Sequence, residues 1–200
     1  ATIRVLTRLG CEVVTLKDFG CCGALADHLG ENKRARKEAR RNIKAILEAS
    51  GNGFNAIVSN ASGCGIALKD YGHLFRADED LKADAEKVAA LTLDVCELLE
   101  RLELGKPHPD RGIRVAWQAS CTLNHGQRVH EVPKALLRHF GYEVVEPKDP
   151  HLCCGFAGTY SILQPERSNE LRTRKAKTLA ALGADVVASG NIGCITGLGS

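Results

Sequence analysis

This sequence lacks methionine, any long apolar run and a large excess of charge of one sign. A net charge of +3 is too small to indicate binding to nucleic acid or anionic lipid. No apolar run approaches the roughly 18–20 residues that span a bilayer, so no transmembrane segment is expected. The chain begins at Ala1, contains no Met and shows no secretory leader, and we therefore expect a fragment of a longer protein.

Cysteine, in contrast, is abundant, with 9 residues in a chain of 200. The remaining composition is that of an ordinary globular protein, with 44% hydrophobic and 26% charged residues. An odd number of cysteines, some of them in adjacent pairs, argues against a framework of disulfides. Because helix and strand patterns alternate and no secretion signal is present, metal ligation is the favoured interpretation.

Two segments place adjacent cysteines directly before a glycine: Cys21-Cys22-Gly23 and Cys153-Cys154-Gly155. A disulfide between neighbouring residues needs a distorted peptide, because bridged Cα atoms are normally further apart. Two neighbouring thiolates can instead reach different atoms of one polynuclear centre, and glycine lets the backbone approach that centre closely. The paired cysteines therefore indicate a metal cluster.

Hydrophobic periodicity predicts an alternation of helices and strands. Helices are expected over 3–9, 24–50, 66–71, 84–102, 132–140 and 165–182. Strands are expected over 11–16, 56–60, 114–118, 143–145 and 184–189. The predicted fold class is α/β and Rossmann-like, with small parallel sheets flanked by helices. Such sheets bind ligands in the turns that follow their strands, here expected at 61–65 and 191–194.

The chain contains an internal repeat. Residues 9–14 match 140–145, and the strand before Gly63-Cys64 matches the strand before Gly193-Cys194. Gly105–Gly112, which holds two prolines, is the expected linker. We therefore expect a first domain over 1–104, a linker over 105–112 and a second domain over 113–200.

The repeat also sorts the cysteines. Cys11 aligns with Tyr142 and Cys96 has no counterpart, so both are interpreted as structural. The counterpart of Cys121 would lie before Ala1, which predicts that the first site is incomplete and lacks one ligand. The candidate metal ligands are Cys21, Cys22 and Cys64 in the first half and Cys121, Cys153, Cys154 and Cys194 in the second.

Four cysteines suit either tetrahedral zinc or a [4Fe–4S] cluster. Adjacent side chains converge poorly on one tetrahedral ion, whereas a cluster spreads its ligand positions over a larger face. An iron–sulfur cluster is therefore favoured, with zinc as the alternative. Residues that flank the cysteines are candidates for contacts around the group, or are ordinary loop residues: Gly23, Asn124, His125, His151, Gly155 and Asn191.

The spacing from Cys121 to Cys153-Cys154-Gly155 and on to Gly193-Cys194 resembles the cysteine-rich CCG domain. The longer strings around Cys21, Cys64 and 153–166 are similar to the glycolate oxidase iron–sulfur subunit family, over nearly the whole chain. One departure is that the first cysteine of the family's Cys-x-x-Cys ending is replaced by Ala61 and by Asn191. This departure argues against a role in disulfide reduction like that of the heterodisulfide reductase relatives. It also leaves the type of cluster open, and a non-standard cluster is one of the alternatives.

The resemblance implies an electron-transfer role. Such a subunit relays electrons from a partner that carries FAD and oxidises glycolate to glyoxylate, toward a quinone or another acceptor. It implies a cytoplasmic location, with peripheral attachment to the inner membrane through the complex. The alternatives are a subunit of a heterodisulfide-reductase-like or lactate-utilisation oxidoreductase, and a zinc-bound module that only assembles subunits. No residue of this chain is predicted to act as a catalytic acid or base.

Overall fold

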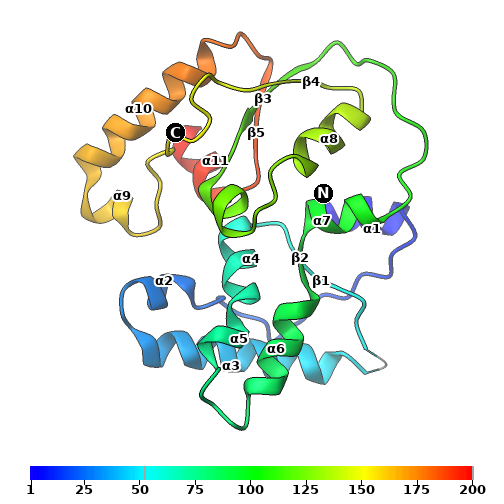
Figure 1. Cartoon of the computed structure of the whole chain (residues 1–200), viewed down its shortest axis with the longest axis vertical. Helices are drawn as coiled ribbons and strands as arrows, with labels where there is room; N and C mark the ends of the chain where they lie inside the picture. The colour runs from blue at the N-terminus through cyan, green and yellow to red at the C-terminus, as the bar shows by residue number, and fades with distance from the viewer. Residues whose placement is uncertain (52, 200) are drawn as a thin grey trace. The chain divides into compact units, whose positions relative to one another are not determined.

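The computed structural model of the chain describes residues 1–51 and 53–199, which fold as two compact units (Figure 1). The first unit comprises Ala1–Leu98 and the second comprises Leu99–Ser200. Each unit contains its own parallel sheet, with helices packed against it. The predicted α/β class with two small parallel sheets is thereby confirmed.

The first unit is mainly helical. Its strands are β1 (Ile57–Ser59) and β2 (Thr92–Asp94), which pair in parallel. Its helices are α1 (Thr2–Arg8), α2 (Ala24–His28), α3 (Asn32–Ala49), α4 (Ser62–Lys69), α5 (Tyr71–Leu74) and α6 (Lys82–Leu91). Helix α7 (Val95–Arg101) continues the chain into the second unit.

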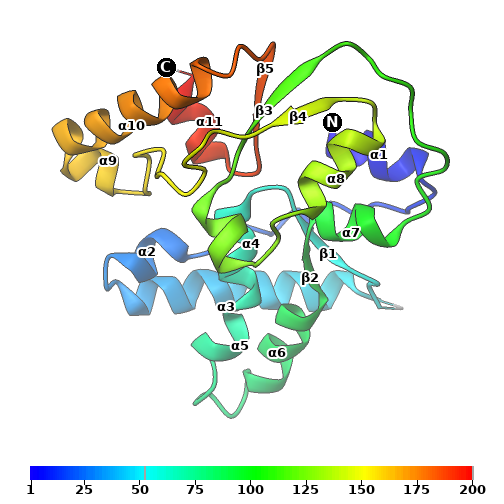
Figure 2. The same ribbon diagram turned by 45° about the horizontal axis from the view of Figure 1, so that its top comes forward.

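Helix α3 supplies much of the core of the first unit, and Figure 2 shows it as the longest helix of that unit. Its apolar side chains recur every three or four residues, so they lie along one face. Ala39, Ile43 and Ile46 on that face are almost completely buried against α4, α5 and α6. Tyr71 and Phe75 fill the centre of the same cluster and are 1% and 0% exposed.

The second unit is built on a three-stranded parallel sheet of order β4-β3-β5. The strands are β3 (Arg114–Gln118), β4 (Glu143–Val145) and β5 (Val186–Ser189). The helices are the π-helix η1 (Thr122–Gly126), α8 (Val132–His139), α9 (Tyr160–Leu163), α10 (Pro165–Ala180) and α11 (Ile192–Leu198). Helix α8 connects β3 to β4 and α10 connects β4 to β5, as parallel strands require.

The direction of these strands places the cysteines. All three strands of the second unit run parallel, so their carboxyl ends lie at one edge of the sheet. Cys121 follows β3, the pair at 153–154 lies in the connection after β4, and Cys194 follows β5. The same order gives Cys64 after β1 in the first unit.

Two of the expected elements in the first unit were wrong. Residues 11–16 were predicted as a strand but form an irregular segment, because no strand among the described residues pairs with them. The single helix expected over 24–50 is divided into α2 and α3. Gly30, which has φ +77°, causes the break, since a left-handed glycine ends a helix.

Two further expectations need correction. The helix expected over 84–102 is interrupted by β2, because pairing with β1 outweighs the helical preference of this short stretch. The turns expected at 61–65 and 191–194 are helical from Ser62 and Ile192 onward. Cys64 and Cys194 therefore lie in the first turns of α4 and α11 rather than in loops.

Among residues 1–51 and 53–199, none of the helices is both long enough and apolar enough to cross a bilayer.

Candidate metal centre

The two Cys-Cys-Gly segments have the same local geometry. Gly23 and Gly155 have φ values of +86° and +81°, in the left-handed region that favours glycine. Each glycine N–H donates a hydrogen bond to the sulfur two residues earlier, at 3.5 Å to Cys21 Sγ and 3.4 Å to Cys153 Sγ. The turn therefore directs a backbone donor at the first sulfur of each pair, a contact that also tunes a sulfur bound to metal.

Each of these turns packs against a long helix further along the chain, α3 in the first unit and α10 in the second. A Cβ on Gly23 would lie 2.9 Å from the carbonyl oxygen of Ala35 in α3. A Cβ on Gly155 would overlap the carbonyl oxygen of Ser168 in α10. The Ser168 hydroxyl donates to the carbonyl oxygen of Gly155 at 2.9 Å, which fixes this contact. Glycine is needed here because the helix backbone occupies the space of a side chain.

Three thiols of the second unit are joined by hydrogen bonds. The Cys154 thiol donates to Cys194 Sγ at 3.0 Å, and Cys153 interacts with Cys154 in turn. Cys154 and Cys194 are buried at 4% and 3% exposed, whereas Cys153 is exposed. The contact with Cys153 lowers the pKa of Cys154, but the hydrogen bond to Cys194 and burial outweigh it and raise that pKa to about 11.

The first unit gathers its cysteines in a similar way. The buried Cys22 thiol is hydrogen-bonded to the exposed Cys64, and Cys21 lies close enough to Cys64 to affect its ionisation. This bond lowers the pKa of Cys64 to about 7, because the donated proton stabilises its thiolate. The same bond and burial raise the pKa of Cys22. One proton of this pair is therefore lost easily, which suits metal ligation.

The residue after Cys121 is tied to the start of the helix that carries Cys194. Cys121 itself is exposed and immediately precedes η1. The Asn191 side chain donates from Nδ2 to Thr122 Oγ1 at 2.9 Å and accepts from the Gly193 N–H at 2.9 Å. Asn191 therefore caps α11, which carries Cys194, and also ties that helix to the segment of Cys121.

The remaining flanking residues are placed differently. Asn124 Oδ1 contacts His130 Nδ1, so this amide is engaged within its own segment. His125 and His151 are exposed, and no hydrogen bond joins either to a cysteine in the part of the chain that the structure describes. Cys11 and Cys96 are half-buried, and the Cys96 amide donates to Asp94 Oδ1 at 2.9 Å. The roles assigned to these residues stay predictions.

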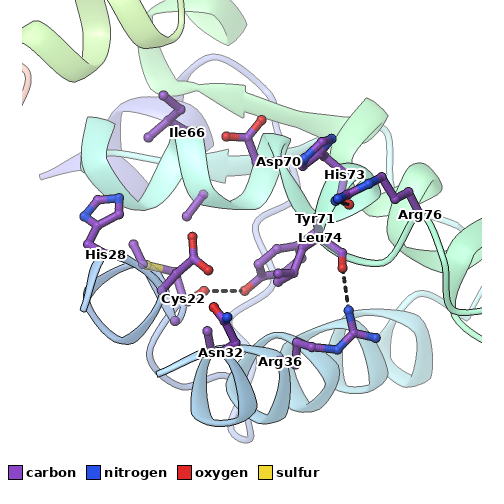
Figure 3. A pocket seen from close by; sticks show the side chains of 15 residues that line it. Cys22, His28, Asn32, Arg36, Ile66, Asp70, Tyr71, His73, Leu74 and Arg76 are labelled. Atoms are coloured by element: carbon purple, nitrogen blue, oxygen red, sulfur yellow. Dashed lines mark hydrogen bonds between the residues drawn. The ribbon is translucent and has the colours of Figure 1, made fainter. Parts of the chain in front are cut away.

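A buried polar network supports the first cysteine pair, and the sequence analysis missed it. Asn42 accepts from the Gly20 N–H and donates to the Cys21 carbonyl oxygen, each at 2.8 Å. It also donates to the Tyr71 hydroxyl at 3.1 Å. That hydroxyl donates to the Cys22 carbonyl oxygen at 3.0 Å, a hydrogen bond that Figure 3 shows as a dashed line. The available signal was a polar residue on the apolar face of α3, because a buried amide needs partners.

Removing this network should destabilise the first unit. In an Asn42→Ala variant the buried Tyr71 hydroxyl loses a donor, and the part-buried Gly20 N–H and Cys21 carbonyl oxygen lose their partner. The expected total cost is about 1–3 kcal/mol. Urea unfolding followed by far-UV circular dichroism measures the loss. Asn32→Ala is the matched control, since Asn32 is exposed at the start of α3. Equal unfolding midpoints for the two variants would contradict the supporting role.

A cavity of about 760 Å³ opens beside this network (Figure 3). Cys22 and Gly23 form part of its wall, together with Asp70, which lies between α4 and α5, and Tyr71 at the start of α5. Arg36 on its rim donates to the carbonyl oxygen of Leu74 at 2.6 Å and pairs with Asp78. The cavity therefore extends to the buried member of the first cysteine pair.

The donor set decides which group these residues fit. Among residues 1–51 and 53–199, no three His, Cys, Asp or Glu side chains surround one point at the geometry of an ion site. Three thiols nevertheless lie together in each unit, two of them in direct contact through a hydrogen bond. Thiolates select soft metals and iron–sulfur clusters. The donor chemistry therefore fits a thiophilic metal group, and no geometry for it is derived from these positions.

Two α/β units, each gathering cysteine thiols beyond the ends of parallel strands, define a class of cysteine-rich protein with a thiol site in each unit. A family model described as a cysteine-rich domain, CCG, matches residues 1–69 and 115–199. The chain belongs to this CCG cysteine-rich domain family.

Several curated proteins are similar over the whole chain. The glycolate oxidase iron-sulfur subunit of Escherichia coli (strain K12) is 39% identical over 201 residues, which cover 100% of this chain and 49% of that protein. Lactate utilization protein A of Oceanobacillus iheyensis is 30% identical, covering 99% of this chain and 80% of that protein. The corresponding protein of Geobacillus thermodenitrificans is 29% identical, covering 100% and 82%. The chain thus spans about half the length of the first relative.

Proposed function

We propose that this chain is an electron-transfer segment that holds iron–sulfur clusters. The observation that carries the proposal is the gathering of three thiols in each of two repeated units. The family match and a relative that is named an iron-sulfur subunit support it. The proposed ligands are Cys21, Cys22 and Cys64 in the first unit and Cys121, Cys153, Cys154 and Cys194 in the second.

The proposed cluster is of the [4Fe–4S] type or a non-standard form with the same ligands. When bound, it would accept and release one electron at a time. The chain supplies thiolate ligands, backbone N–H donors to Cys21 and Cys153, and a buried setting around Cys154 and Cys194. Backbone donors and burial both shift the reduction potential of such a group. No residue of the chain is assigned chemistry at carbon.

The proposed complex is an oxidoreductase that acts on a 2-hydroxy acid. The relative at 39% identity is named for glycolate oxidase, so glycolate is the proposed donor. The proposed partner is an FAD-containing subunit that oxidises it to glyoxylate, and the proposed acceptor is a quinone. The proposed location is the cytoplasm, with attachment to the inner membrane through the complex. Lactate is the second candidate donor, because two of the similar proteins are named for lactate utilization.

Anaerobic purification tests the metal assignment. We expect a brown protein that contains iron and acid-labile sulfide and has a broad visible absorption, because thiolate-to-iron charge transfer colours such clusters. Iron, sulfide and zinc are measured on the same sample. Stoichiometric zinc without iron would refute the proposal and favour a zinc-bound assembly module. Reduction by the co-purifying flavoprotein, with glycolate and lactate compared as donors, then tests the complex.

A further inference from the structure

Helices α3 and α10 contact the two Cys-Cys-Gly turns in equivalent positions. Helix α3 meets the first Cys-Cys-Gly turn at Ala35, and α10 meets the second at Ser168. Two helical turns further along, these helices carry Asn42 and Lys175 respectively. Both side chains are 0% exposed. The two repeated units therefore have a buried polar side chain at the same position, neutral in one and cationic in the other.

Both side chains also donate a hydrogen bond to a backbone carbonyl oxygen. Asn42 donates to the carbonyl oxygen of Cys21 at 2.8 Å. Lys175 donates from Nζ to the carbonyl oxygen of Pro150 at 3.0 Å, in the segment that leads into the second cysteine pair. A carbonyl oxygen is a neutral acceptor, so this hydrogen bond leaves the positive charge of the ammonium uncancelled.

The titratable groups that interact with Lys175 are the thiols of the second unit and Asp149. Burial lowers the pKa of Lys175, whereas Cys154, Cys194, Cys153 and Asp149 favour its protonated form. A group bound through thiolates is itself negative and would favour the ammonium further. Interactions between buried charges are screened less than those at the surface. The second site therefore has a nearby positive charge that the first site lacks at this position.

We propose that the buried ammonium of Lys175 raises the reduction potential of the cluster held by the second unit, and that Asn42 gives the first unit no such effect. The inference rests on the iron–sulfur function proposed above. Adding one electron from the flavoprotein makes the cluster more negative and breaks no bond. A fixed positive charge nearby stabilises the reduced form more than the oxidised form. The reduction potentials of the two repeated sites are therefore expected to differ.

The test is a redox titration of the purified chain, followed by electron paramagnetic resonance. Signals of the second site are those that disappear in a Cys154→Ser variant. Lys175→Gln removes the charge and keeps a hydrogen-bond donor, so it separates charge from support of the backbone. At a fixed potential we expect the ratio of reduced to oxidised second cluster to fall about tenfold, a shift of about 59 mV for one electron.

Lys177→Gln is the matched control, because Lys177 is exposed on the same helix. Solvent screens its charge, and the potential of the second cluster should stay at the wild-type value. Lys175→Met provides a second neutral variant of similar size, and it should lower the potential in the same direction.

Unchanged potentials in the Lys175 variants, with full cluster content, would overturn the inference and leave the proposed function intact. Loss of the cluster in both the Gln and the Met variants would also overturn it, since Lys175 would then be a structural support. Absence of iron from the wild-type chain would refute the proposed function itself. The three outcomes are therefore distinguishable.

Discussion

Replacing Cys154 with Ser is expected to remove the iron and sulfide of the second unit. Its thiol is 4% exposed and lies 3.0 Å from Cys194 Sγ, at the centre of the hydrogen-bonded thiols. A serine hydroxyl is a poor ligand for the soft metals that thiolates hold. The loss should reach the whole content of that site, and iron and acid-labile sulfide analysis on anaerobically prepared protein measures it.

Cys96→Ser is the control for this experiment. Cys96 is half-buried in the first turn of α7 and interacts with Asp94, so its thiol is engaged away from the paired cysteines. The Cys96 variant should keep the wild-type iron content. Equal losses in the two variants would contradict the assignment of ligands to the repeated positions.

Gly155→Ala is expected to be among the most destabilising single changes in the second unit. The new Cβ would overlap the Ser168 carbonyl oxygen and approach the backbone nitrogen of Arg172 to 3.0 Å. Left-handed φ costs a non-glycine residue about 1–2 kcal/mol, and overpacking of this kind adds roughly 1–3 kcal/mol. Trp117, the single tryptophan, lies 6% exposed on β3, so its fluorescence during urea unfolding reports on this unit.

Gly183→Ala separates the two contributions. Gly183 also has a positive φ, +58°, but a Cβ there would meet nothing within 4 Å. Only the conformational cost of about 1–2 kcal/mol is therefore expected. The midpoint of the Trp117 transition should fall clearly further for Gly155→Ala than for Gly183→Ala. Similar midpoints would show that α10 moves away from the turn at little cost.

The two sites differ in the burial of their cysteines and in the side chains that support them, and the sequence repeat does not reveal these differences. The Cys-Cys-Gly turns agree in φ and in their N–H to sulfur contacts. Their second members nevertheless pair differently, with an exposed Cys64 in the first unit and a buried Cys194 in the second. The support beneath also differs, as Asn42 and Lys175 show. A repeated motif therefore sets which atoms meet, whereas the neighbours set the electrostatics.

Some parts of the fold were predictable because local chemistry decides them. Helices α8 and α10 lie close to the segments predicted from periodicity, and Pro133 and Pro165 stand at their first turns. The parallel sheet of the second unit was expected from alternating helices and strands. Other parts of the fold were not predictable from the sequence. Thr92–Asp94 lies within a stretch whose periodicity predicts a helix, and it forms a strand because it pairs with β1.

The sequence by itself determined the repeat, the α/β class and the choice of candidate cysteines, because these depend on spacing and residue type along the chain. Only the tertiary structure decided which thiols touch, which are buried, and that Asn42 and Lys175 lie beneath the paired cysteines. These facts depend on contacts between residues distant in sequence. The pattern of a single helix does not reveal what covers its buried polar residue.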